Sequence, residues 1–309
     1  DLSRFNQSFL TEIHEYMRDG KLYGLPVPPY FPNVLYYNID LFDAFGVEYP
    51  KDGMTWDETY ELAQTLTRMH GDTQIRGFKA NILGMTRDNA FSVPILDPEA
   101  DKLGDETLWQ KVFTNLYRFY QIPGNEMTSN AVEFNAFSEG VAAMSAHLHS
   151  VYLVIPENIN WDIVSIPVME GAPARVNQRG PAYWSIASTS KHKDAAFEAI
   201  MVMLSDEIQM EDSLKGIPTT LDNEEIQAVL GQGDPIYKTK NMKAISYYPP
   251  TEPKKSRAPG LVDVPMVTQQ AIIRDAFIEY ASNQKDLNTA LRDASEKLKQ
   301  YIEEEKAKQ

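Results

Sequence analysis

The chain of 309 residues can form one large or two medium domains, and it has no apolar run of the ~18 residues that a membrane span requires. Its net charge of −15 argues against binding to nucleic acid or to an anionic membrane surface, because both need a basic face. The absence of cysteine excludes disulfides, thiolate metal sites and a cysteine nucleophile within these residues.

The first part of the chain predicts a helix followed by two strands. A stripe formed by Phe5, Phe9 and Ile13 indicates the helix within residues 1–20. Residues 21–27 and 34–38 have the composition of strands, being apolar, β-branched or aromatic. The prolines between these two segments keep the chain extended, which predicts a crossing from one part of the fold to another.

The next segments predict two helices and an irregular stretch between them. Thr55 and Glu58 have the spacing of a capping box, which predicts a helix that ends at Gly71. Residues 77–94 have no helical period, so we expect a strand and then a long loop. Residues 106–121 carry an apolar stripe and predict the second helix.

The second half of the chain continues the alternation of strands and helices. Residues 161–168 predict a strand, and the proline-rich, charged segment 246–260 predicts a connection. Two helices are expected at the end of the chain, over 266–281 and 286–304. A further helix over 194–207 is expected to turn four apolar side chains inward, namely Phe197, Ile200, Met201 and Leu204. This alternation is typical of an α/β protein.

The order of residues between positions 19 and 58 is distinctive. The residues that carry the pattern are Gly20, Lys21, Tyr23, Gly24, Pro26, Tyr37, Asn38, Leu41, Phe42, Gly46, Pro50, Thr55, Trp56 and Glu58. With NAFSEGVAAMS at 135–145 and LKGIPT at 214–219, the chain closely resembles the extracellular solute-binding proteins of bacterial ABC importers, most of which bind sugars or oligosaccharides. Val141 departs from the lysine that is usual after Gly140 in this family.

The resemblance implies an α/β, two-lobed periplasmic-binding-protein-like fold of type II. One lobe would contain residues 1–29 and 182–244, and the other would contain residues 31–180 and 246–309. The chain would cross between the lobes near 28–33, 178–184 and 246–260. Because the strand at Lys21 lies well inside the N-terminal lobe of family members, we expect an N-terminally truncated chain with that lobe incomplete.

The resemblance also implies the function. We expect a monomeric protein, not an enzyme and without a cofactor, that binds a carbohydrate between its lobes and delivers it to an ABC permease. It would lie outside the cytoplasm, either in the periplasm or on the outer face of the membrane through a lipid anchor in a preceding segment. Two alternatives stay open: the same fold could bind a metal or a polyamine, or the chain could process glycans, although it has no G-x-S-x-G, H-E-x-x-H, P-loop or G-x-G-x-x-G motif.

Carbohydrate sites combine aromatic rings, which stack on sugar faces, with planar groups that hydrogen-bond hydroxyls. We expect such residues where strands and crossings reach the cleft. The candidates are Tyr30, Phe31, Asn33, Asn81, Arg87, Asp88, Asn89, Phe91, His147, His149, Arg179, Tyr183, Trp184 and Asp263.

Each candidate has a structural alternative. Trp184 could be a stacking platform or a core residue, and Arg87 with Asp88 could hold ligand hydroxyls or form a surface ion pair. His147 and His149 are two residues apart, which places them on the same side of a strand. They could hydrogen-bond the ligand, be satisfied by backbone, or coordinate a metal, although no third ligand is tied to them in the sequence.

Overall fold

The computed structural model describes residues 1–17, 19–175 and 178–308, apart from the side chains of Gln178 and Arg179. The strands, in chain order, are β1 (Leu25–Val27), β2 (Phe31–Asn38), β3 (Arg68–His70), β4 (Thr73–Ile75), β5 (Lys79–Ala80), β6 (Met144–Leu148), β7 (Trp161–Ser165), β8 (Gln178–Arg179) and β9 (Ala182–Trp184). The helices are α1 (Gln7–Met17), α2 (Ile39–Phe45), α3 (Trp56–Leu66), α4 (Ile82–Arg87), α5 (Glu106–Tyr120), α6 (Asn130–Asn135), α7 (Lys193–Met203), α8 (Asp206–Leu214), α9 (Glu224–Ala228), α10 (Met266–Ala281) and α11 (Leu287–Lys306), with 3₁₀ turns η1 (His149–Leu153), η2 (Tyr237–Thr239) and η3 (Met242–Ser246).

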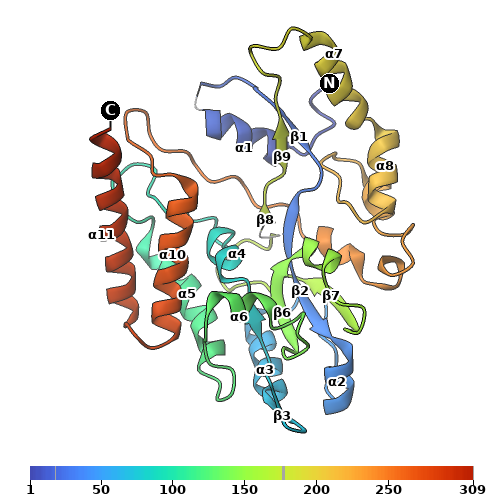
Figure 1. Ribbon diagram of the computed structural model, residues 1–309, viewed down its shortest axis with the longest axis vertical. Coiled ribbons are helices and arrows are strands. Elements are labelled where there is room, and N and C mark those ends of the chain that lie inside the picture. Colours follow the sequence, from blue (N-terminus) through green and yellow to red (C-terminus); the bar gives the residue numbers. More distant parts are fainter. Residues whose placement is uncertain (18, 176–177, 309) are drawn as a thin grey trace.

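The elements form two groups, which Figure 1 shows one above the other. The upper group contains α1, α7, α8 and the antiparallel pair β1–β9. The lower group contains the larger sheet, whose strand order is β5-β6-β2-β7, with β8 paired to the start of β2. Helices α5, α10 and α11 cover one side of this lower group (Figure 1).

Strand β2 is the central strand of the larger sheet. It pairs antiparallel with both β6 and β7, and it is buried over almost its whole length. Alternate side chains of a strand point to opposite faces. Accordingly, Leu35 and Tyr37 pack in the main hydrophobic core with α3, α5, α10 and α11, whereas Val34 and Tyr36 pack in a second core with β7 and η3.

The predicted capping box of α3 is confirmed. The Thr55 side chain accepts from the Glu58 amide, and the Glu58 carboxylate accepts from the Thr55 amide. These hydrogen bonds from the amide and hydroxyl of Thr55 lower the pKa of Glu58. The predicted end of this helix was wrong, because it stops at Leu66 and the chain continues into the exposed hairpin β3–β4.

The sequence pattern of residues 77–94 did not predict helix α4, which lies within that segment. Asn81 caps it by accepting from the amide of Gly84. The helix is short and buried on several sides, so its sequence carries no one-sided apolar stripe from which a helical period could be read. Its C-terminal residue, Arg87, is followed directly by Asp88, and the two side chains form an ion pair.

Helix α7 forms over most of the expected range, but its orientation differs from the prediction. Phe197 is 51% exposed, and none of the side chains of α7 is buried. Among the four residues expected to turn inward, Leu204 is the buried one, and it lies just after the helix in a small core with Phe5, Leu10 and Val27. None of the described helices combines the length and hydropathy that crossing a bilayer requires.

A buried ion pair joins the sheet to helix α6. Lys79 Nζ lies 2.8 Å from Glu133 Oε1, and both side chains are fully buried. Lys79 also donates to the carbonyl oxygens of Asn125 and Glu126, so one ammonium group fixes three segments. Burial lowers the pKa of Lys79 and raises that of Glu133, while each partner's charge opposes this effect.

We predict that Glu133→Gln lowers the free energy of unfolding by about 3–5 kcal/mol, because it leaves the Lys79 charge buried without its partner. Urea denaturation followed by circular dichroism measures this change. The control is Glu48→Gln, which removes an exposed ion pair with Lys51 and should change stability by less than about 1 kcal/mol. Equal effects of the two substitutions would contradict the assignment of a structural role to the buried pair.

Candidate functional site

A cavity of about 720 Å³ is lined by residues from both groups of elements. Its wall on the side of the upper group comes from α1, and the facing wall comes from the end of α4 and the loop that follows it. Residues 251–257, the segment that begins α10, Gly180 and Glu305 line the rest of the cavity. The cavity is therefore built by segments that are far apart in the sequence.

The α1 wall is polar because the helix is amphipathic. Phe9 and Ile13 are buried on its inner side. Ser8, Glu12 and Glu15 are spaced by four and three residues, which places them on one face, and all three line the cavity. The same periodicity that predicts the helix thus directs two carboxylates into the cavity.

The facing wall presents the Arg87–Asp88 pair. Arg87 Nε and Nη2 donate to the two carboxylate oxygens of Asp88 at 2.8 and 2.5 Å, in a bidentate arrangement. Asn89 shapes the loop behind them, because its amide group donates to the carbonyls of Thr86 and Val93 and accepts from the Val93 amide. The loop is therefore held in one conformation by side-chain to backbone bonds.

Segment 251–257 has no helix or strand and is held by side chains. Glu15 Oε2 accepts from the Ser256 amide at 3.1 Å and from its hydroxyl at 3.0 Å. Lys254 Nζ donates to the carbonyl oxygen of Arg87. The segment is thereby tied to α1 on one side of the cavity and to α4 on the other.

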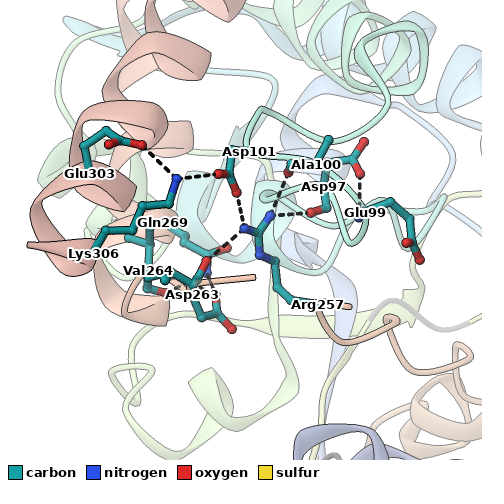
Figure 2. Close-up of polar contacts among 11 residues, drawn as sticks. Asp97, Glu99, Ala100, Asp101, Arg257, Asp263, Val264, Gln269, Glu303 and Lys306 are labelled. Carbon is teal, nitrogen blue, oxygen red and sulfur yellow. Dashed lines mark hydrogen bonds and ion pairs between the residues drawn. The ribbon is translucent and has the colours of Figure 1, made fainter. Parts of the chain in front are cut away.

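Arg257 anchors the far end of this segment, as Figure 2 shows. Its guanidinium donates to the carbonyls of Asp97 and Ala100 at 2.7 Å, to Asp101 Oδ1 at 2.5 Å and to the Val262 carbonyl. Asp101 also accepts from Lys306 of α11. These bonds, chiefly the one from Arg257, lower the pKa of Asp101 and connect the cavity rim to the C-terminal helix.

Four of the residues predicted from the sequence line this cavity: Arg87, Asp88, Asn89 and Asp263. Among the described residues, the lining does not include Tyr30, Phe31, Asn33, Asn81, Phe91, His147, His149, Tyr183 or Trp184. For Arg179 the structure gives the backbone, which lies in β8, and its side chain is outside the description.

The aromatic candidates have other surroundings. Tyr30 is buried, and its ring centroid lies 5.3 Å from that of Phe9. Phe91 packs against the main core. Trp184 lies in β9 opposite Leu25 and is 42% exposed. Tyr183 lies just behind the cavity wall, where its hydroxyl contacts Glu12 Oε2 at 2.9 Å.

The two histidines do not share one side of a strand. His147 is in β6, with its ring against Phe134, whereas His149 already belongs to η1 and lies against Phe31 and Tyr152. Both are buried. Burial lowers the pKa of His147 to about 4 and that of His149 to about 3. Within the described residues, no group of three or more His, Cys, Asp or Glu side chains is placed to hold a metal ion.

The candidates predicted from the sequence do not include four residues that line the cavity, namely Glu12, Glu15, Lys254 and Ser256. A signal for the first two was present, because the polar face of α1 repeats at helical spacing opposite its apolar stripe. No comparable signal marks Lys254 and Ser256, since their segment has no periodic structure. Their role depends on contacts with α1 and α4, more than 150 residues away in the sequence.

The model of one protein family matches residues 2–210, and its description is bacterial extracellular solute-binding protein. The chain belongs to this family. No curated protein matches it. The family assignment agrees with the resemblance seen between positions 19 and 58, and it shows a solute-binding protein of an extracellular class.

Solved structures share the fold of this solute-binding protein. A sugar transporter protein from Rhizobium etli in an open conformation is 21% identical, with a TM-score of 0.66, over 95% of this chain and 76% of that one. UgpB from Mycobacterium tuberculosis with glycerophosphocholine is 15% identical, with a TM-score of 0.69, over 98% and 76%. A cyclic α-maltosyl-1,6-maltose binding protein from Arthrobacter globiformis is 14% identical, with a TM-score of 0.70, over 97% and 78%. The predicted α/β periplasmic-binding-protein fold is thereby confirmed.

We predict that the NMR signals of the His147 and His149 rings stay those of neutral imidazole from neutral pH down to about pH 5. Both pKa values lie below the ordinary 6.5, so the unfolded chain binds protons first as the pH falls. The stability that these residues contribute is complete above pH 6.5 and is lost as the pH falls, toward about pH 4 for His147 and about pH 3 for His149. The variants His147→Gln and His149→Gln each assign the signals of one ring, and a titration of either ring near pH 6.5 would contradict the prediction.

Proposed function

We propose that this solute-binding protein captures a carbohydrate in the cavity between α1 and α4 and delivers it to an ABC permease. The observation that carries the proposal is the cavity itself, whose volume of about 720 Å³ is within the range of small-ligand sites. Solved structures of the same fold include one with mannotriose, one with D-mannitol and one with cycloalternan.

The lining suits a polyhydroxylated ligand. Carboxylates accept hydrogen bonds from hydroxyls, whereas ammonium and guanidinium groups donate to hydroxyl and ring oxygens. The cavity offers both kinds, with Glu12 and Asp88 as acceptors and Lys254 and Arg87 as donors. We propose these four, together with Asp263, as ligand contacts.

The proposed motion is closure of two lobes around the ligand. The lobes are residues 1–29 with 182–244 and residues 31–180 with 246–309, and the hinges are the crossings near 28–33, 178–184 and 246–260. Support comes from the lining, in which α1 belongs to one proposed lobe and α4 and α10 to the other. A ligand that contacts both walls stabilises the closed arrangement by its additional contacts, and the permease can distinguish this arrangement from the open one.

The remaining parts of the proposal concern the setting of the protein. It acts as a monomeric binding protein without catalytic activity, outside the cytoplasm, either in the periplasm or at the outer face of the membrane. A lipid anchor on cysteine would require residues beyond these 309, which contain none. The extracellular class of the family supports this location.

We predict that calorimetric titration with mannotriose, cycloalternan, D-mannitol and D-tagatose gives saturable heat with one saccharide class. Small-angle X-ray scattering should then show a smaller radius of gyration in the bound form. Ser8→Trp, which fills the cavity from α1, should abolish binding. Thr11→Trp, on an exposed position of the same helix, should leave it unchanged.

Parallel titrations with spermidine, glycerophosphocholine and divalent metal salts separate the competing ligand classes. Binding of one of these in place of every saccharide would overturn the carbohydrate assignment and keep the solute-binding role. Incubation of the saccharides with the protein, followed by chromatography, tests the enzyme alternative, and we expect no cleavage products.

A further inference from the structure

Glu12 is fixed in the cavity wall by two neighbouring segments. A Cβ atom on Gly180 would lie 2.0 Å from Glu12 Oε2, so the carboxyl group packs directly on the backbone of the crossing between β8 and β9. The same oxygen lies 2.9 Å from the hydroxyl of Tyr183 in β9. Glu12 is therefore held against this backbone, and it is one of the residues that line the cavity.

The hydrogen bonds around Tyr183 bear on the protonation of Glu12. The Tyr183 hydroxyl also lies 2.7 Å from the carbonyl oxygen of Phe9, and a carbonyl oxygen can only accept. A hydroxyl has one proton to donate. When that proton goes to Phe9, the contact between Tyr183 and Glu12 becomes a hydrogen bond only if the carboxyl group of Glu12 carries a proton and donates it.

Among the described residues, no cation forms an ion pair with the carboxyl group of Glu12. The charge of Lys254 acts on this carboxyl group, but the Lys254 ammonium group donates its hydrogen bond to the carbonyl oxygen of Arg87. Burial raises the pKa of Glu12 most strongly, and the charge of Asp88 raises it further. The charge of Lys254 lowers this pKa, as does the Tyr183 hydroxyl when it donates to Glu12 instead of to Phe9. Arg87 is paired with Asp88.

Glu15, one turn further along α1, accepts from Ser256 and lies on the same wall. The Lys254 ammonium group has two protons beyond the one that it donates to Arg87. A hydroxyl group placed between Lys254 and Glu12 could accept from the former and donate to the latter.

We propose that Glu12 is protonated in the ligand-free protein and that the carbohydrate binds to its carboxylate form, so that one proton is released to solvent as the ligand enters. This inference rests on the proposed function. A sugar hydroxyl donates to the ionised carboxylate and accepts from Lys254, which compensates the burial of both charges. Acid conditions then weaken binding, because the proton competes with the ligand for Glu12.

The test is isothermal titration calorimetry with mannotriose, cycloalternan and D-mannitol, over a series of pH values and in two buffers of different ionisation enthalpy. For whichever saccharide binds, we expect a buffer-dependent heat that corresponds to release of up to one proton. The affinity should fall by about tenfold per pH unit below the raised pKa of Glu12. The proton release and the pH dependence of the affinity can both be measured on the native protein, without any variant.

Substitutions then assign the proton. Glu12→Gln should remove both the buffer-dependent heat and the fall in affinity at low pH, whereas Glu12→Asp should retain them. Glu48→Gln, which changes an exposed carboxylate outside the cavity, should behave as the native protein. Circular dichroism and melting temperature verify that each variant is folded.

The outcomes separate the two proposals. Saccharide binding without proton release in the native protein, or with unchanged proton release in Glu12→Gln, would overturn the role of Glu12 and leave carbohydrate binding standing. Failure of every saccharide to bind at any pH would overturn both. Proton release that disappears with Glu12→Gln alone establishes the linkage.

Discussion

The antiparallel pairing of β2 with β6 and β7 is the constraint on which the rest of the structure depends. Alternate side chains of β2 pack in two different hydrophobic cores. A shift of the pairing register by one residue would therefore place each set of side chains in the wrong core. The start of β2 also pairs with β8, and β1 and β9 pair just beyond these two strands. The same ladder therefore fixes the lower group and brings residues 28–30 close to residues 180–181.

The cavity follows from that placement. Residues of α1 and of the end of α4 line it together, and segment 251–257 is hydrogen-bonded to both helices. Hydrogen bonds to Glu15, Arg87 and the loop at residues 97–101 hold the segment, although it has no regular structure of its own. Polar groups that are already positioned lose little conformational entropy on binding, which favours affinity for a polar ligand.

The lining of the cavity carries charged groups of both signs. The chain has a net charge of −15, yet the cavity mixes cations and anions that are partly bound to one another. Such a lining offers both donors and acceptors to an uncharged ligand. It also contains the carboxyl group of Glu12, whose pKa is raised by burial.

The sequence by itself determined the features that depend on near neighbours along the chain. Helices α5, α10 and α11, the capping box of α3 and the strand character of β2 all follow from spacing and propensity, and the residue order from 19 to 58 indicated the family.

Only the tertiary structure decided where the cavity lies and what lines it. Arg87 and Asp88 were predicted there, but Glu15 and Ser256, which are 241 residues apart, meet through packing that no local pattern encodes. The reason is physical: capping and periodicity act over a few residues, whereas the cavity arises from contacts that form when distant segments are brought together by the sheet.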